Sequence, residues 1–376
     1  FPGNRISEWT GLLVSNQPTS DDVDFDWGHN PLMTPRNAII ALNAHSDGDV
    51  TLDMQESGLI SKCLSPLTSF VPYDYPGFWQ SLHDFANQSG WSVIDVDSGH
   101  EFGLDPLDDV SIMIESGLVS ILPPALLPSH PSHLEFPGPV ASNAPRTESN
   151  LTFHSNQTGL PREFGPANPR AMILHSTGLY APPGEPVTVV VPQELVDSGV
   201  SVQVGVHDDT LWHKSKIWRF PSIVRSYPIA ETQFEVGNAF GGPIFLASPP
   251  DAPLGSTWAE FRGGVEAPIY QHGSTSFSEW QIIRNRSAPW AEISSDQFIM
   301  SVPSSEIRGL DNPEELMDFW VEALEMEHEL YGFMPWPRIE RAAFDIQISA
   351  GWMHSGYPFM AHLVSAQEAV DLEHME

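Results

Sequence analysis

Short β-branched runs alternate with turn-forming residues between positions 171 and 268, and this pattern constrains the fold more than any other feature. Residues 187–191 are β-branched throughout, and residues 200–206 alternate between apolar and small or polar side chains. Residues 244–246 form a third apolar run, directly behind a Gly-Gly-Pro turn. Breakers that recur about every ten residues are typical of an antiparallel β-sandwich. We therefore expect a β-sandwich over residues 170–286.

The first 125 residues show both helical and strand-like patterns. Phe78, Leu82 and Phe85 fall on one face of a helix that Asn87 and Gly90 end. Three short apolar runs are expected to be strands: residues 37–42, 91–96 and 110–114. Helices that alternate with such runs indicate layers of helix and sheet. We therefore predict an α/β domain over residues 1–125.

Residues 126–169 are rich in Pro, Ser, Asn and His and have little periodicity, so we expect a linker there. His130 and His133 have the look of a metal-binding pair. A Pro-rich loop offers two imidazoles no rigid platform, however, and a polar loop is the favoured interpretation.

Residues 287–376 are predicted to form a mixed sheet with a helix. Residues 296–303 have the pattern of a strand, and a helix is expected to follow from a cap at Asp311 or Asn312. Pro313 suits the first turn of that helix, and the acidic residues directly after it are favoured by the helix dipole. The predicted fold class is thus multidomain α+β.

The charge balance excludes several classes of partner. The chain has 49 acidic and 16 basic residues, a formal net charge of −33, and only three of the basic residues are lysine. A negative field of this size repels phosphate backbones, so neither nucleic acid nor an anionic membrane is an expected partner.

Cys63 is the one cysteine, so no intrachain disulfide forms. No run of 18 apolar residues is present, so no membrane span is expected.

Four glycosylation sequons and the first residues favour a secreted or extracellular protein. The sequon asparagines are Asn87, Asn150, Asn156 and Asn285. The numbering opens at Phe1-Pro2 instead of Met, which predicts that a leader has been removed.

The residues alone do not assemble a complete active site. His328-Glu329 begins like the zinc motif His-Glu-x-x-His, but Gly332 stands where the second histidine ligand is needed. Neither a Gly-x-Ser-x-Gly nucleophile turn nor a glycine-rich phosphate loop occurs. His207, Asp208 and Asp209 at a strand end could bind a cation, and a polar turn is the simpler interpretation.

Four segments resemble, in the same order, the enhancin-like zinc metallopeptidase family, which includes viral enhancins, mucin-directed bacterial peptidases and animal channel-associated factors. The segments are residues 176–187, 238–244, 288–293 and 351–358. The resemblance covers about residues 170 to 370, and the last segment is the most specific. It implies that residues 287–376 are the first, incomplete lobe of a zincin-like domain.

The resemblance also implies a substrate cleft. It places residues 346–353 at a sheet edge along that cleft, where a peptide can add as a strand. The residues expected to line the cleft are Gly351, Trp352, His354, Ser355 and Tyr357. The alternative is that Trp352 and Tyr357 are core aromatics and His354 is a structural imidazole. Zinc is implied as the cofactor, with no ligands to it in this chain.

The predicted function is the N-terminal portion of a secreted enhancin-like zinc metallopeptidase that acts on proteins or glycoproteins, with the catalytic helix absent from this chain. An apolar surface is expected around residues 340–376, so a C-terminal chain or another polypeptide should complete the domain. The alternative is a non-catalytic extracellular binding or structural protein that retains the scaffold. A cation-binding acidic matrix protein is a third possibility that rests on charge alone.

Overall fold

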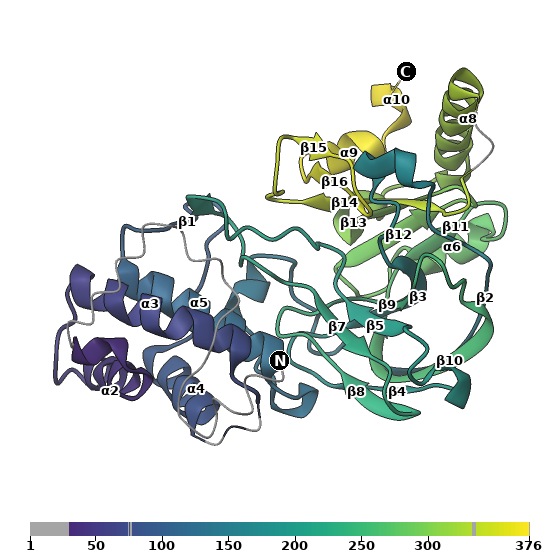
Figure 1. The fold of residues 1–376 in the computed structure, drawn as a ribbon. Helices are drawn as coiled ribbons and strands as arrows, with labels where there is room; N and C mark the ends of the chain where they lie inside the picture. Colours follow the sequence, from purple (N-terminus) through teal and green to yellow (C-terminus); the bar gives the residue numbers. More distant parts are fainter. Residues whose placement is uncertain (1–29, 74, 76, 333–335, 376) are drawn as a thin grey trace. The chain divides into compact units, whose positions relative to one another are not determined.

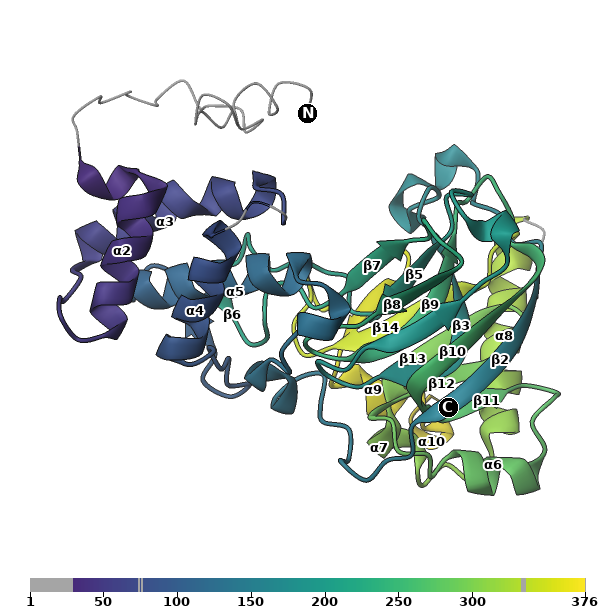
Figure 2. The same cartoon turned by 90° about the horizontal axis from the view of Figure 1, so that it is seen from below.

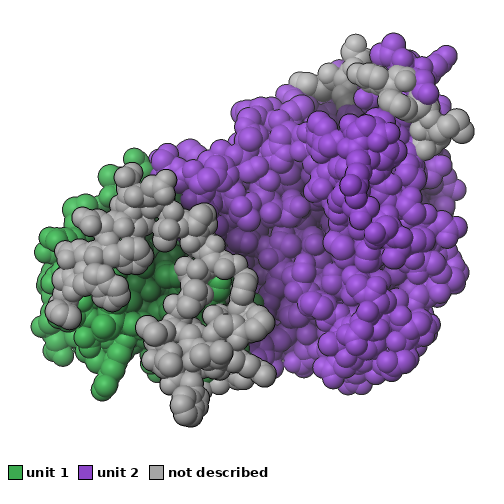
Figure 3. All heavy atoms as spheres, viewed as in Figure 1, with its two compact units in different colours: residues 1–93, 101–122 green, residues 94–100, 123–376 purple. Residues whose placement is uncertain are grey.

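The computed structural model describes residues 30–73, 75, 77–332 and 336–375 (Figure 1). The prediction about Phe1-Pro2 lies outside these residues. Two compact units are present: residues 1–93 with 101–122, and residues 94–100 with 123–376 (Figure 3).

The first unit is helical where the structure describes it, which corrects the expected α/β domain. Its elements are η1 (Pro31–Met33), α2 (Pro35–Ser46), α3 (Met54–Phe70), α4 (Phe78–Ser89) and α5 (Pro106–Ile121). The two-residue β1 (His100–Glu101) lies between α4 and α5, and the division between the units falls inside it. The predicted helix at Phe78 is confirmed as α4. The predicted strands at 37–42 and 110–114 instead lie inside α2 and α5, and residues 91–96 form no strand.

The physical reason for the error is visible in α5. Asp105 caps this helix by accepting hydrogen bonds from the backbone N–H of Leu107 and Asp108, and Pro106 occupies its first position. The apolar run at 110–114 is therefore the middle of a buried helix. A short apolar run does not distinguish a buried strand from a buried helix by periodicity.

Residues 126–169 contain more structure than the predicted linker. The elements in and next to this segment are η2 (Pro124–Leu126), η3 (Pro131–Leu134), β2 (Thr147–Ser155) and η4 (Arg162–Ala167). β2 pairs antiparallel with β10 along its whole length, as Figure 2 shows, and so belongs to the next sheet. His130 is buried and lies against the rings of Phe220 and Phe240, at 4.4 and 4.7 Å between centroids.

The predicted strands of the central segment are confirmed. The elements are β3 (Ile173–Ala181), β4 (Val187–Val190), η5 (Gln193–Leu195), β5 (Ser201–Val204), β6 (Lys216–Ile217), β7 (Arg225–Pro228), β8 (Gln233–Val236), β9 (Gly242–Ser248) and β10 (Gly255–Glu266). The strand order is β7-β5-β9-β3-β10-β4-β8, and β2 also pairs with β10.

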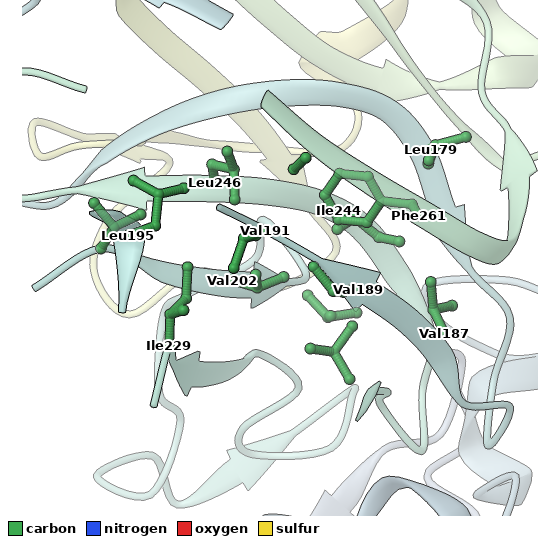
Figure 4. Packing of buried hydrophobic residues seen from close by; sticks show 14 of the residues in the cluster. Leu179, Val187, Val189, Val191, Leu195, Val202, Ile229, Ile244, Leu246 and Phe261 are labelled. Carbon is green, nitrogen blue, oxygen red and sulfur yellow. The ribbon is translucent and has the colours of Figure 1, made fainter. Parts of the chain in front are cut away.

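This sheet folds over itself into two layers. Val189 of β4 and Val202 of β5 share one buried cluster, although three strands separate β4 from β5 in the order (Figure 4). β10 makes the corner, because it pairs with β4 up to Arg262 and with β3 from Val265 onward. Gly263, at φ 102°, lies at the register shift between these two stretches, where a residue without Cβ is favoured.

A mixed six-stranded sheet follows. Its elements are β11 (Ile269–Gln271), α6 (Phe277–Ile283), β12 (Trp290–Ser294), β13 (Phe298–Pro303), α7 (Ser304–Ile307), α8 (Pro313–Tyr331), β14 (Glu340–Asp345), β15 (Met353–His354), β16 (Phe359–His362), α9 (Ser365–Ala369) and α10 (Leu372–Met375). The strand order is β11-β12-β13-β14-β16-β15. The lobe therefore begins near residue 269, earlier than the predicted boundary at 287.

The predicted cap of the long helix is confirmed. Asn312 caps α8 by accepting from the backbone N–H of Glu315, and Pro313 is its first residue. Gly332 ends the helix in a left-handed conformation at φ 70°, which glycine adopts without strain. The glycine that interrupts the zinc-like motif is thus a helix C-cap.

The two faces of the mixed sheet have different partners. Ala342 and Phe344 of β14 belong to the cluster that includes Leu316 of α8. Ala343, which points to the other face, packs in a second cluster with Phe245 of β9. The mixed sheet is therefore held between its helices and the strands β3 and β9.

A buried polar seam joins the mixed sheet to the sandwich. The Arg219 guanidinium donates from Nε and Nη2 to the Asp345 carboxylate at 2.8 and 2.7 Å, and both side chains are fully buried. Arg341 is also buried, and it contacts Glu292 and Ser176. Bidentate charge-assisted pairs of this kind fix the relative position of the elements that carry them.

We predict that Asp345→Asn lowers the free energy of unfolding by about 3–5 kcal/mol, because it leaves the Arg219 charge buried without a counter-charge. Urea unfolding followed by tryptophan fluorescence measures this change. Asp251→Asn is the matched control, since it breaks the exposed Arg170–Asp251 pair and is expected to cost about 0–1 kcal/mol. Equal effects of the two changes would contradict the role given to the buried pair.

Candidate functional site

A hollow of about 620 Å³ lies beside β15 and β16 in the second unit. Its lining residues are Val96, Lys214, Trp218, Ile346, Gln347, Ile348, Gly351, His362, Leu363 and Val364. Most of them come from the β14–β15 connection, from the end of β16 and from residues 214–218. We call this hollow the groove.

The predicted edge strand at 346–353 is wrong for most of its length. β14 ends at Asp345, and residues 346–352 form bends and a turn that includes Gly351 at φ 64°. β15 is only two residues long and pairs antiparallel with β16, His354 opposite Met360. β15 nevertheless ends the strand order, so its outer edge is unpaired within the described part of the chain (Figure 1).

Trp352 stands at the groove with its ring exposed. Its side chain stacks on His362, a lining residue, at 4.5 Å between centroids and 13° between planes. Its indole N–H donates to Ser365 Oγ at 3.0 Å. With a residue exposure of 56%, Trp352 offers an orientated aromatic face to solvent.

His354 ties the β14–β15 connection to the sandwich. Its Nε2 lies 2.8 Å from Asp209 Oδ2 and 3.1 Å from Ser349 Oγ, and its Nδ1 lies 2.9 Å from the Ser355 carbonyl oxygen. Ser, His and Asp do not form a nucleophilic triad here, because the serine and the aspartate contact the same imidazole nitrogen. The arrangement is one that positions a loop.

Tyr357 and Ser355 lie apart from the groove lining. Tyr357 is buried, its hydroxyl accepts from the Leu174 backbone N–H, and the Arg338 guanidinium lies 4.1 Å from its ring centroid. Ser355 is exposed. The structure thus brings Gly351 and Trp352 to the groove, places His354 behind it, and packs Tyr357 as a core aromatic.

The segment 207–218, which we call the loop 207–218, belongs to this site. The sequence analysis considered only His207, Asp208 and Asp209 of it, as a possible cation site, and missed the rest. The backbone N–H of Trp218 donates to Gln347 Oε1, and Gln347 Nε2 donates to the Lys216 carbonyl oxygen, both at 2.9 Å. Asp209 accepts from the Ser349 N–H at 2.7 Å. The signal that could have found the rest is the occurrence of two of the chain's three lysines, Lys214 and Lys216, between Trp212 and Trp218.

The described residues do not fit a zinc site. No group of three His, Cys, Asp or Glu side chains that could hold a metal ion occurs among them. His354 and Asp209 provide two such groups, one fewer than a catalytic zinc needs. Within the same residues, no helix is both long and apolar enough to cross a membrane.

The four sequon asparagines are all exposed, as an acceptor for a glycan must be. Asn87 lies on α4 and Asn150 on β2, while Asn156 and Asn285 follow β2 and α6.

Two family models match the chain. Residues 145–257 match the N-terminal domain of M60-like peptidases, and residues 263–376 match Peptidase M60, enhancin and enhancin-like.

Relatives among curated proteins are channel-associated factors. TRPM8 channel-associated factor homolog from Xenopus laevis is 38% identical over 57% of this chain and 24% of its own length. TRPM8 channel-associated factor 2 from Mus musculus is 34% identical over 62% of this chain and 26% of its own length. The chain thus spans about a quarter of these relatives.

One solved structure that aligns with the chain is the catalytic module of the metalloprotease ZmpA from Clostridium perfringens. It is 12% identical, has a TM-score of 0.46, and the alignment covers 59% of this chain and 50% of that one.

We predict that the hydrogen bonds of His354 to Asp209 and Ser355 stabilise the fold more in mild acid than in mild base. Burial lowers the pKa of His354, but hydrogen bonds to the Ser355 carbonyl and the Asp209 carboxylate outweigh this, and the net pKa is raised. A raised pKa adds stability that is complete below the unfolded value of about 6.5 and is lost as the pH rises through the folded value.

The measurement is the melting temperature of the wild type minus that of His354→Gln, at about pH 6 and about pH 9. Other histidines titrate in both proteins, so their effects cancel in the difference. The difference should be larger at the lower pH. A difference that is flat or grows with pH would refute the charged tie.

Proposed function

The two matched segments of this chain belong to the M60-like, enhancin-like peptidase family, and we propose that the chain supplies the peptide-binding groove of such a peptidase. In this proposal the substrate is an extended segment of a protein or glycoprotein. The reaction of the complete enzyme is peptide hydrolysis by metal-activated water. The observations that carry the proposal are the groove, which Gly351 lines, and the unpaired edge of β15, which begins two residues later.

The geometry of β15 supports recognition of a peptide through its backbone. A strand at a sheet edge presents free N–H and C=O groups, and an extended peptide can pair with them as an additional strand. Trp352 and Gly351 lie next to that edge, so an aromatic face and an open backbone are both available to the peptide. We assign Gly351, Trp352 and His354 to substrate binding or to its support. Ser355 and Tyr357 are neighbours of these residues, Ser355 on the exposed side and Tyr357 on the buried side.

The proposal assigns zinc and its ligands to a polypeptide segment other than these 376 residues. No His-Glu-x-x-His occurs in the sequence, and the described residues gather no three-residue metal site. By itself the chain is expected to bind substrate and not to hydrolyse it.

Exposed apolar side chains support a polypeptide partner. Met353 and Val364 are each more than half exposed beside Trp352, and Met326 and Leu330 are exposed on α8. Neighbouring apolar groups on a surface are typical of a protein interface. The proposal therefore includes a partner segment that covers this surface and completes the domain.

We further propose an extracellular location with glycans on Asn87, Asn150, Asn156 and Asn285. Their exposure supports this part of the proposal, as does the occurrence of four sequons in one chain.

The alternative function is a non-catalytic binding protein. It is favoured by the 34–38% identity to proteins named TRPM8 channel-associated factors and by the lack of a zinc motif in this sequence. In that case the groove and the exposed apolar side chains would dock a partner protein, such as a channel, without cleaving it.

We predict that Trp352→Ala weakens peptide binding about tenfold or more, because exposed tryptophans at binding sites are common hot spots. The measurement is fluorescence anisotropy with labelled decapeptides in which Thr and Val alternate with varied residues. Trp258→Ala is the matched control, since Trp258 is a partly exposed tryptophan of β10. Peptides N-methylated at every residue have no backbone N–H on either edge and should fail to bind, and equal binding of methylated and unmethylated peptides would contradict strand addition.

Zinc content separates the two functions. If the peptidase proposal holds, the protein purified from its native source with its partner carries about one zinc per complex and cleaves casein until a chelator is added. If the binding proposal holds, the same preparation is free of zinc and inert. Digestion of that material with peptide N-glycosidase F lowers its mass where the sequons carry glycans.

A further inference from the structure

We propose that the groove selects peptide segments that carry an acidic side chain, and that Lys214 and Lys216 determine this preference. The inference rests on the proposed peptide-binding function and adds the substrate class to it. It is carried by where the cations of this strongly acidic chain are placed and by how rigidly they are held.

Most arginines of the second unit are already neutralised. Those in ion pairs with carboxylates are Arg146, Arg170, Arg219, Arg262, Arg284, Arg286, Arg338 and Arg341. Lys214 and Lys216, two of the three lysines in the sequence, have no carboxylate partner within the described ranges, and Lys214 lines the groove. The groove is thus a place where positive charge remains available in a chain of net charge −33.

The lysines are held by a rigid backbone. Gln347 bridges both sides of Lys216 and Ile217, because its side chain binds the Lys216 carbonyl oxygen and the Trp218 N–H. His213 Nε2 lies 2.9 Å from the Ser349 carbonyl oxygen. On the other flank, a Cβ on Gly99 would lie 2.6 Å from the Ile217 carbonyl oxygen, so the chain packs tightly there too. A fixed backbone limits the region that the lysine side chains can reach, so less backbone entropy is lost when they bind a ligand.

The side chain of Lys216 is also held in position, by the ring of Trp218. Its Nζ lies 5.3 Å from the centroid of Trp218, a lining residue, which is within the range of a cation–π contact. Lys214 makes no such contact in the described structure, so its ammonium group is the one left to pair with a ligand.

Several carboxylates lie near the groove, but none of them is a lining residue. Asp345 is paired with Arg219, and Asp209 is paired with His354. Asp95, next to the lining residue Val96, accepts from the N–H and the hydroxyl of Ser98 within its own turn. Asp97 is an exposed carboxylate next to Val96, and the exposed Glu135 accepts from the Val96 backbone N–H at 3.5 Å. Among the lining residues themselves, Lys214 is the one Lys, Arg, Asp or Glu, so a ligand in the groove meets its ammonium group at short range.

The chemistry favours a carboxylate on a peptide over a nucleic acid. The net charge of −33 repels a polyanion at long range, whereas a single Glu or Asp side chain carries one charge and contacts the lysine at short range. A partly exposed ion pair of this kind gives a modest preference that salt weakens.

The test uses three sets of the alternating Thr/Val decapeptides, which differ only in a Glu, Gln or Lys placed at each position in turn. At low ionic strength we expect the best Glu peptide to bind about three- to fivefold more tightly than its Gln counterpart. Lys214→Met should abolish this preference, and Lys214→Glu should transfer it to the Lys peptide. Binding in about 0.5 M salt should remove most of the difference.

Lys62→Glu is the matched control, because it makes the same charge change on an exposed residue of α3 in the first unit. It should leave the preference unchanged, and an equal loss in this variant would overturn the inference by showing that net charge alone is responsible. If peptides bind with no preference for Glu, the inference fails while the proposed function stands. If no peptide of any set binds, the proposed function itself is overturned.

Discussion

The buried pair between Arg219 and Asp345 holds together the parts from which the groove is built. Asp345 is the last residue of β14, and its carboxylate also accepts from the Gln347 N–H, which turns the chain into the groove lining. Arg219 comes from the sandwich side and donates to the Asp209 carbonyl oxygen as well. One ion pair thus sets the positions of residues 346–348 and of the loop that begins at 207. Neither charge has access to water. If one partner moves, the other is left as an unpaired charge in a buried environment, which costs free energy.

Around this pair, hydrogen bonds join two sequence-distant loops next to the apolar cluster that contains Val206 and Ile348. Gln347, Ser349 and His354 bind partners in the loop 207–218 that are separated from them by more than a hundred residues. Polar contacts of this kind are directional, so they fix the shape of the groove more narrowly than apolar packing does. They also leave Trp352 and Lys214 free at the surface, since the side chains behind them carry the structural role. A rigid support under exposed binding groups is what a recognition site requires.

Local patterns in the sequence predicted some elements well and failed where context decides. The cap at Asn312 and the strands at 187–190 and 201–204 follow from local chemistry and alternation, and all are confirmed. The run at 110–114 lies in a helix instead of a strand, because a helix buried on several sides loses its polar face and with it the 3.6-residue signal. The run at 37–42 is also helical, although α2 buries Ala38 and Leu42 and leaves Ile40 exposed. Strand β2 was missed because its alternating pattern is weak and its partner β10 lies a hundred residues away.

The sequence by itself determined the family, the sandwich strands, the capped helix and the segment from which the groove is lined, since each depends on residues close together in the chain. The tertiary structure alone decided which of the candidate residues face the groove. Trp352 is exposed and Tyr357 is buried, although five positions separate them and both are aromatic. It also decided that Lys214 and Asp209 belong to the same site. The reason is that exposure and pairing depend on contacts between β14, the sandwich and the loop 207–218, and no local pattern encodes contacts over such distances.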